Sequence, residues 1–321
     1  MAKIPVSILS GFLGSGKTTL LAQILQDSAY KNSAIIINEM GEVGLDDRIL
    51  ASQISFVAEN MVLLKSGCVC CNKREDLIKQ LKEILEDFEA KGKQLDQVIV
   101  ETTGLANLTP ILFSIRSDVF LESHFEVGTI ISCIDALNAK LHLQEEICKN
   151  QIAFSDIAIL TKLDISTNDT KDITNALLNI NPYLKIYPKD TLPSNVFQRT
   201  QHIKTPKITD NYVVDSTKNS IDNISSFVLG LENSIEWNAF GVWLSFLLYK
   251  YGEQILRIKG LIDIGEEYLV SIDGAMHILH TPRHIPKNMP STQDKSDAFI
   301  VFITKGLQKQ HIIESFYAFC K

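Results

Sequence analysis

The sequence predicts an α/β fold, in which a mostly parallel sheet with helices on both faces is followed by a small α+β C-terminal domain. Three observations predict it. Short runs rich in β-branched residues alternate with longer amphipathic segments up to about residue 190, and such alternation is typical of a parallel sheet covered on both faces. A polar, proline-interrupted stretch follows, and then a second set of helix and strand patterns. Because 321 residues suffice for two domains, we expect domains at 1–190 and 224–321, joined by a linker at 191–223.

The individual elements are predicted from the spacing of their apolar residues. In the first domain, strands are expected at 4–9, 34–37, 97–101, 128–134 and 157–160. The clearest helix is expected from Lys73 to Lys91, and Gly92 can end it. In the C-terminal domain, helices are expected at 240–251 and 310–319, and strands at 255–262, 268–272 and 299–303. The stripe of Phe240, Trp243, Phe246 and Leu247 has helical spacing and is expected in the core.

A glycine-rich loop stands where the first strand turns into a helix. Gly11 is followed by four residues and then by Gly16, Lys17 and Thr18, which is the pattern of a phosphate-binding loop and predicts a P-loop NTPase. Such a loop surrounds phosphates with backbone N–H groups at a helix N-terminus. Lys17 is expected to reach the β- and γ-phosphates, and Thr18 to hold Mg²⁺. The residues expected to bind nucleotide here are Gly11, Gly14, Ser15, Gly16, Lys17, Thr18 and Thr19.

Two later segments complete the predicted nucleotide site. The strand at 97–101 ends in Glu101, whose carboxylate can orient Mg²⁺ or its waters, and Gly104 would bring a backbone N–H to the γ-phosphate. Thr161, Lys162, Leu163 and Asp164 follow the strand at 157–160, which is the guanine-binding position of GTPases. A carboxylate at Asp164 accepts two hydrogen bonds from guanine, whereas adenine has no such donor pair. We therefore expect GTP rather than ATP, although Thr161 stands where Asn is usual.

Three cysteines within four residues are the sharpest feature of the chain. Cys68, Cys70 and Cys71 directly precede the predicted long helix, and a helix N-terminus favours the thiolate form that binds metal. Three thiolates leave a fourth tetrahedral position open, and they select Zn²⁺ or Cu⁺, with Co²⁺ and Ni²⁺ as alternatives. Glu39 or Glu42, in the acidic segment after the second strand, is a candidate for the fourth ligand. The alternative is a redox-active or merely buried cysteine cluster.

Composition narrows the possible partners and the compartment. The net charge of −7, with no cluster of lysine or arginine, predicts no binding to nucleic acid. We also expect no membrane span, because no apolar stretch approaches the roughly 18–20 residues required, and we expect a cytoplasmic protein. The scattered Cys133, Cys148 and Cys320 are expected to be small buried hydrophobic residues. His277 and His280 would point to opposite faces of a strand at 275–279, so neither is expected to bind metal.

Five elements occur in a fixed order: GFLGSGKTT, NEMGEVGLD, GCVCC, ETTGLAN and TKLD. In this order they resemble the CobW-like family of metal-associated GTPases, densely over residues 4–165 and in outline beyond. The resemblance implies a GTPase domain, a small C-terminal domain, and delivery of zinc or another transition metal to a client metalloprotein. It also implies that Cys68, Cys70 and Cys71 are the metal cysteines, with Glu39 and Glu42 as contributing carboxylates. The histidine-rich tract of some cobalt-associated members is absent from the sequence.

Together these features predict a GTP-hydrolysing metallochaperone whose cofactors are GTP, Mg²⁺ and Zn²⁺. Lys17, Thr18 and Glu101 are the expected catalytic residues, and a slow intrinsic rate is expected because no glutamine stands in an obvious water-positioning place. The segment with Glu39 and Glu42 is expected to join the nucleotide state to the metal site. Two alternatives remain open: a phosphotransferase that uses ATP, and a non-catalytic zinc sensor or buffer. The sequence does not predict the oligomeric state.

Overall fold

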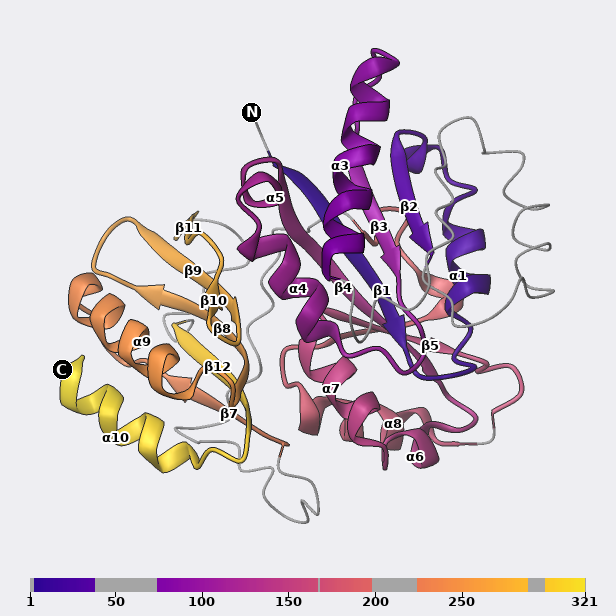
Figure 1. Cartoon of the computed structure of the whole chain (residues 1–321). Helices are drawn as coiled ribbons and strands as arrows, with labels where there is room; N and C mark the ends of the chain where they lie inside the picture. Colours follow the sequence, from indigo (N-terminus) through magenta and orange to yellow (C-terminus); the bar gives the residue numbers. More distant parts are fainter. Residues whose placement is uncertain (1–2, 38–73, 167, 198–223, 288–297, 321) are drawn as a thin grey trace. The chain divides into compact units, whose positions relative to one another are not determined.

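The computed structural model describes residues 3–37, 74–166, 168–197, 224–287 and 298–320. These residues form two compact units, and each contains its own sheet (Figure 1). The first unit comprises Met1–Thr174 and Leu184–Arg199, and the second comprises Asn175–Tyr183 and Thr200–Lys321. Asn175–Tyr183 thus groups with the second unit, whereas the sequence analysis assigned it to the first domain.

Within the described part of the first unit, six parallel strands are ordered β2-β3-β1-β4-β5-β6. Every residue of β2, β3 and β5 is buried, as expected for a parallel sheet covered on both faces. The strands are β1 (Ile4–Gly11), β2 (Ser33–Ile37), β3 (Gln97–Glu101), β4 (Phe125–Asp135), β5 (Ile157–Thr161) and β6 (Lys185–Pro188). Because β1 lies between β3 and β4, the carboxyl ends of these three strands meet at one edge of the sheet.

Helices connect these strands in the way that parallel pairing requires. They are α1 (Lys17–Ile24), α3 (Arg74–Ala90), α4 (Leu108–Ser117), α5 (Val119–His124), α6 (Ala139–His142), α7 (Glu146–Phe154) and α8 (Thr170–Ile180), with short 3₁₀ turns η1 (Ser28–Tyr30) and η3 (Lys189–Thr191). The long helix α3 ends as predicted. Gly92 has φ +63°, and the N–H of Lys93 bonds the carbonyl of Phe88 at 2.9 Å, which closes the helix.

The five strands predicted for the first domain are all present, and β1 and β4 extend beyond the predicted ranges. Strand β6 was not predicted. Among the described strands it pairs with β5 alone, its residues are half-buried, and it ends in Pro188. Its sequence therefore resembles a polar connection more than a buried strand.

The second unit contains an antiparallel sheet in the order β10-β9-β8-β12-β7, and β11 also pairs with β9. Its strands are β7 (Ile224–Gly230), β8 (Ile255–Asp263), β9 (Tyr268–Ala275), β10 (Ile278–Leu279), β11 (Arg283–Pro286) and β12 (Phe299–Lys305). Helices α9 (Trp237–Tyr251) and α10 (Lys309–Phe319) pack beside each other over this sheet (Figure 1). Among the described helices, none is long and apolar enough to cross a bilayer.

The second unit has its own hydrophobic core, in which Trp243 is central. Its ring meets Phe302 and Phe316 edge to face at 6.3 and 5.1 Å, and its indole N–H donates to Ser315 Oγ at 3.0 Å. Phe240 and Leu247 are also buried here, as predicted. Phe246 was wrongly assigned to this core, since its side chain is 64% exposed. The spacing of apolar residues thus assigned one residue too many to the buried side of α9.

Candidate nucleotide-binding site

The glycine-rich loop joins β1 to α1 and is shaped by its glycines. A Cβ on Gly11, which has φ +141°, would lie 2.5 Å from the carbonyl oxygen of Cys133, so no side chain fits there. Gly14 and Gly16 have φ of +69° and +82°, a left-handed conformation that glycine adopts at least cost. The loop therefore turns tightly into α1, whose first N–H groups lack intrahelical partners and can bind anions.

Lys17 is the first residue of α1 and is held over the loop. It is 9% exposed, and its Nζ donates to the carbonyl oxygens of Gly11 at 2.9 Å and Phe12 at 3.2 Å. The cation is thus positioned by the loop that would surround the phosphates. Thr19, also predicted to bind nucleotide, lies in the first turn of α1. The helix is anchored by the buried side chains of Lys17, Leu20 and Leu21.

The two side chains predicted to act on Mg²⁺ meet directly. Thr18 Oγ1 donates to Glu101 Oε1 at 2.6 Å, although the two residues lie 83 positions apart in the sequence. Glu101 is the last residue of β3 and is 3% exposed, and β3 pairs with β1 so that Glu101 stands opposite Leu9. Parallel pairing therefore brings this carboxylate to the first turn of α1.

The segment after β3 lies against the glycine-rich loop. The N–H of Thr102 bonds the carbonyl of Leu9 at 2.9 Å, and its hydroxyl donates to Ser10 Oγ at 3.2 Å. A Cβ on Gly104 would lie 2.6 Å from the backbone nitrogen of Leu13. Only glycine permits this approach, which is why the segment at 102–104 can reach the place expected for the terminal phosphate.

Gln151 on α7 holds this same segment, and sequence analysis missed it. The side chain is 1% exposed, and its Nε2 donates to the carbonyl oxygens of Gly104 and Ala106, both at 3.1 Å. One amide group thus fixes two backbone positions of the segment. The available signal was a polar residue opening the run Gln-Ile-Ala-Phe just before β5.

Thr161, at the end of β5, is tied to the glycine-rich loop. Its buried hydroxyl lies 2.8 Å from the carbonyl oxygen of Ser15 and 3.1 Å from that of Ile134, and can donate to either. The residue that departs from the usual Asn therefore still contacts the phosphate-binding loop. Asp164, three residues on, is exposed.

Lys162 is anchored by Asp135, which sequence analysis also missed. Lys162 adopts φ +57°, and its Nζ lies 2.8 Å from Asp135 Oδ2. Burial raises the pKa of Asp135, but hydrogen bonds from Lys162 and Asn138 outweigh it and leave the pKa below its ordinary value. The carboxylate stays charged and orients the segment at 161–164. Its sequence signal is a carboxylate at the end of a strand, as at Glu101.

Two buried hydroxyls of the site have no hydrogen-bond partner among the described residues. They are Ser15 Oγ in the glycine-rich loop and Thr103 Oγ1 beside Gly104. A buried hydroxyl without a partner is costly, and a phosphate oxygen would accept from it. The orphan donors, the tight glycines and the buried lysine all fit a bound triphosphate.

The predicted metal ligands Cys68, Cys70, Cys71, Glu39 and Glu42 lie outside the described residues. Within the described part of the chain, no group of three or more His, Cys, Asp or Glu side chains could hold a metal ion. Cys133 and Cys148 are buried as predicted, and burial raises the pKa of each thiol to about 12. Cys320 is only partly buried, which differs from the prediction, and burial raises its pKa to about 11.

The histidine pair is arranged differently from the prediction. No strand runs through 275–279, because β9 ends at Ala275 and Met276, with φ +55°, starts a turn into β10. His277 lies in this turn, where its Nδ1 is 3.0 Å from the carbonyl oxygen of Leu248. This contact links the turn between β9 and β10 to α9. We therefore assign His277 a structural role rather than a role in metal binding.

Comparison with known proteins gives matches over both units. The family described as "CobW/HypB/UreG, nucleotide-binding domain" matches residues 5–188, and "Cobalamin synthesis protein cobW C-terminal domain" matches residues 224–320. The zinc chaperone YjiA of Escherichia coli is 26% identical over 326 aligned residues, which cover 98% of each chain. The zinc-regulated GTPase metalloprotein activator 1 of Schizosaccharomyces pombe is 35% identical over 188 residues, 57% of this chain and 45% of that protein.

Among solved structures, the Zn(II)-bound YjiA GTPase from E. coli is similar along the whole length. It aligns with 100% of both chains at 25% identity and a TM-score of 0.73. This likeness, with the sheet order described above, confirms the predicted P-loop α/β fold with a small C-terminal α+β domain.

Proposed function

The chain belongs to the CobW/HypB/UreG family of nucleotide-binding proteins, and on that premise we propose that it is a GTP-hydrolysing metallochaperone that delivers zinc to a client metalloprotein. The observation that carries the proposal is the Thr18–Glu101 contact beside the buried Lys17 in a phosphate-binding loop. The two relatives described above, one matching 98% of this chain and the other 57%, are both named for zinc and for GTPase activity.

Guanine specificity is supported by the way β5 leads into the segment at 161–164. Lys162 is held by Asp135 and Thr161 by the glycine-rich loop, so the exposed Asp164 follows on a fixed backbone. In this proposal the Asp164 carboxylate accepts the two guanine donors. ATP lacks them, which argues against the ATP-dependent phosphotransferase.

Hydrolysis in this proposal is driven by positioned charge. Lys17 leaves the carbonyl oxygens of Gly11 and Phe12 for the β- and γ-phosphates, and the Gly104 N–H meets the γ-phosphate. Thr18 and Glu101 would hold Mg²⁺ and its waters, and that ion would neutralise charge on the phosphate oxygens. No described side chain is assigned as a base, so we expect a slow intrinsic rate that a client protein accelerates.

The zinc site in this proposal consists of Cys68, Cys70 and Cys71, completed by Glu39 or Glu42. Both carboxylates follow β2, where GTPases place a segment that responds to the γ-phosphate. If GTP orders that segment, it brings a carboxylate to the thiolates, and the zinc and nucleotide affinities become coupled. Coupling is reciprocal, so zinc must tighten GTP by the factor by which GTP tightens zinc.

The decisive experiment is a GTP titration of metal-free and zinc-loaded protein. We expect zinc to tighten GTP by roughly 5- to 150-fold, the usual range of coupling between two sites. The matched variant replaces Cys68, Cys70 and Cys71 with Ser, which should abolish the difference and leave metal-free GTP affinity unchanged. Equal GTP affinity with and without saturating zinc would rule the mechanism out.

Lys17→Ala separates this proposal from a non-catalytic zinc sensor or buffer. The variant should lose GTP binding and hydrolysis, keep zinc binding in the absence of nucleotide, and fail to activate a client. If the Lys17→Ala protein still activated a client, the non-catalytic zinc sensor or buffer would be favoured. If the wild type bound ATP more tightly than GTP, the ATP-dependent phosphotransferase would be favoured.

A further inference from the structure

Helix α9 is apolar on two opposite sides. One side carries Phe240, Trp243, Leu244, Leu247 and Leu248, which are buried in the core of the second unit. The other side carries Val242, Phe246 and Tyr249, which are 50%, 64% and 87% exposed. A helix that is apolar all round is ordinarily buried, so the outer side of α9 calls for a covering surface.

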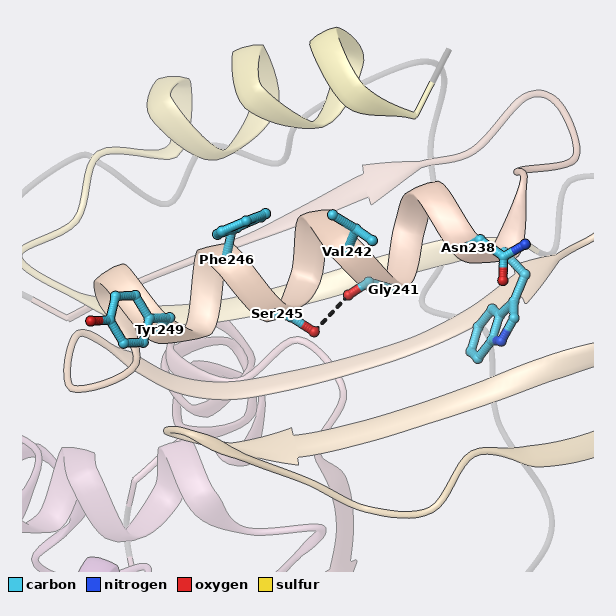
Figure 2. A pocket seen from close by; sticks show the side chains of 7 residues that line it. Asn238, Gly241, Val242, Ser245, Phe246 and Tyr249 are labelled. Carbon is cyan, nitrogen blue, oxygen red and sulfur yellow. Dashed lines mark hydrogen bonds between the residues drawn. The ribbon is translucent and has the colours of Figure 1, made fainter.

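The outer side forms an open groove of about 850 Å³, and the described residues that line it all belong to α9. Figure 2 shows the side chains along the helix, with Asn238 near one end, Tyr249 near the other, and Val242 and Phe246 between them. The Ser245 hydroxyl donates to the carbonyl of Gly241 at 2.7 Å, so it lies against the helix backbone. The helix surface at Ser245 is therefore lower than at Val242 or Phe246. The groove thus alternates raised and low positions.

Large and small residues on this side of α9 stand at positions that a two-fold axis through the middle of the helix would bring face to face. About the midpoint between Trp243 and Leu244, Phe246 corresponds to Gly241, Val242 to Ser245, and Tyr249 to Asn238. In an antiparallel pair of identical helices, each large side chain would therefore face a smaller one on the other copy. Self-complementarity of this kind is the requirement of an isologous two-fold interface.

Charges at the two ends of α9 fit the same arrangement. No Asp, Glu, Lys or Arg occurs from Trp237 to Tyr249, while Glu236 precedes this run and Lys250 follows it. An antiparallel pair would place Lys250 of each copy beside Glu236 of the other and would oppose the two helix dipoles. A parallel pair would instead bring like charges together at both ends.

We propose that the outer side of α9 is a homodimer interface, on which a second copy of this chain docks its own α9 antiparallel about the Trp243–Leu244 midpoint. The uncharged run is about 20 Å long and a helix about 10 Å wide, so the helix pair buries a few hundred Å² per copy. Stable complexes bury about 800 Å² per partner, so the dimer should be weak, with a dissociation constant on the order of tens of micromolar.

Sedimentation velocity of the full chain tests this proposal. With a chelator present, so that cysteines cannot join copies through metal, the wild type should pass from monomer to dimer between about 5 and 500 µM. Phe246→Glu places a charge in the groove and should raise the dissociation constant at least about tenfold. Because Phe246 is 64% exposed, the variant should keep its far-ultraviolet circular dichroism and melting temperature.

Two controls fix the place and direction of the interface. Val119→Glu makes the same apolar-to-acid change at an 84% exposed site on α5 and should leave dimerisation unchanged. Lys250→Glu would face Glu236 in the antiparallel pair and should weaken the dimer by about threefold or more, whereas a parallel pair would be unaffected. A monomer at every concentration, a Phe246→Glu dimer of wild-type affinity, or indifference to Lys250→Glu would overturn the proposal.

Discussion

Gln151 is the residue whose role the structure adds most clearly to the nucleotide site. Its Nε2 bonds the carbonyl oxygens of Gly104 and Ala106, and so fixes the segment that is expected to meet the γ-phosphate. Gln151→Met keeps the length but removes both donors. We expect GTP affinity to fall about tenfold while GDP affinity changes little, since GDP has no γ-phosphate.

The measurement is parallel titration of GTP and GDP. Gln144→Met, on an exposed glutamine before α7, is the matched control and should behave as wild type. Equal losses for GTP and GDP would show that Gln151 serves only general folding. The split between the two nucleotides is what distinguishes positioning from stability.

Asp135 makes folding stability depend on pH. Its ordinary pKa is 3.8, and hydrogen bonds from Lys162 and Asn138 lower the pKa in the folded protein in spite of burial. A depressed folded pKa stabilises the fold above the unfolded pKa, and this stabilisation is lost as pH falls through the folded pKa. The free energy of unfolding of wild type should therefore exceed that of Asp135→Asn by more at pH about 6 than at pH about 3.

Urea denaturation at both pH values measures this difference. Asp169→Asn, at an exposed site before α8, is the control for loss of one negative charge. A stability gap between wild type and Asp135→Asn that does not change with pH would contradict the assignment of the lowered pKa to this ion pair.

At the residue scale, the sequence predicted groups that a local pattern specifies. Gly11, Gly16, Lys17 and Thr18 lie within eight positions, so the motif alone places them together. Gln151 contacts Gly104 across 47 positions, and the polar residue at the start of an apolar run does not by itself identify so distant a partner. Thr161 was treated as a departure from Asn, yet its hydroxyl makes the contact to Ser15 that fixes the loop.

At the scale of elements, the segment after β3 lies so close to the glycine-rich loop that no side chain fits at Gly104. Gly104→Ala would place a Cβ 2.6 Å from the backbone nitrogen of Leu13, so one of the two backbones must move. We expect a loss of about 1–3 kcal/mol in the free energy of unfolding and a marked loss of GTP affinity.

Denaturation and nucleotide titration measure the two effects. Gly230→Ala, where an added Cβ meets nothing within 4 Å, is the control and should be close to neutral. A Gly104→Ala protein with wild-type GTP affinity would show that the two elements need not touch for the site to form.

Elements were predicted well where burial on both faces gives a continuous apolar run. β2, β3 and β5 are of this kind, and each was predicted to within one residue. β6, β7, β10 and β11 were missed, and each lies at the outside of its sheet among the described strands. β6 and β11 also carry polar or proline residues, and β10 has only two residues. Phe246 shows the same limit, because helical spacing does not tell which of two apolar sides faces the core.

At the scale of the whole molecule, the two units have separate hydrophobic cores. Phe302 is fully buried in the second core and stacks on Phe227 at 5.2 Å between ring centroids. Phe302→Ala should cost about 3–5 kcal/mol, and it should act on the second unit. Calorimetry of the full chain should then show one transition lowered, while GDP affinity stays within about twofold of wild type.

Phe319→Ala, at a 53% exposed site on α10, is the control and should leave both transitions in place. If Phe302→Ala lowered every transition together, the two cores would unfold as one cooperative structure. That result would contradict the prediction that the two units unfold independently.

The burial of Cys133 and Cys148 has a practical consequence for assays of metal loading. With pKa values near 12, these thiols carry almost no thiolate at neutral pH and should stay silent toward a chromogenic disulfide reagent in the native protein. Cys320, whose pKa is about 11, adds at most a slow and constant background. If Cys68, Cys70 and Cys71 bind zinc as proposed, the fast colour yield should come from them, and its decrease on zinc loading would measure zinc occupancy by absorbance.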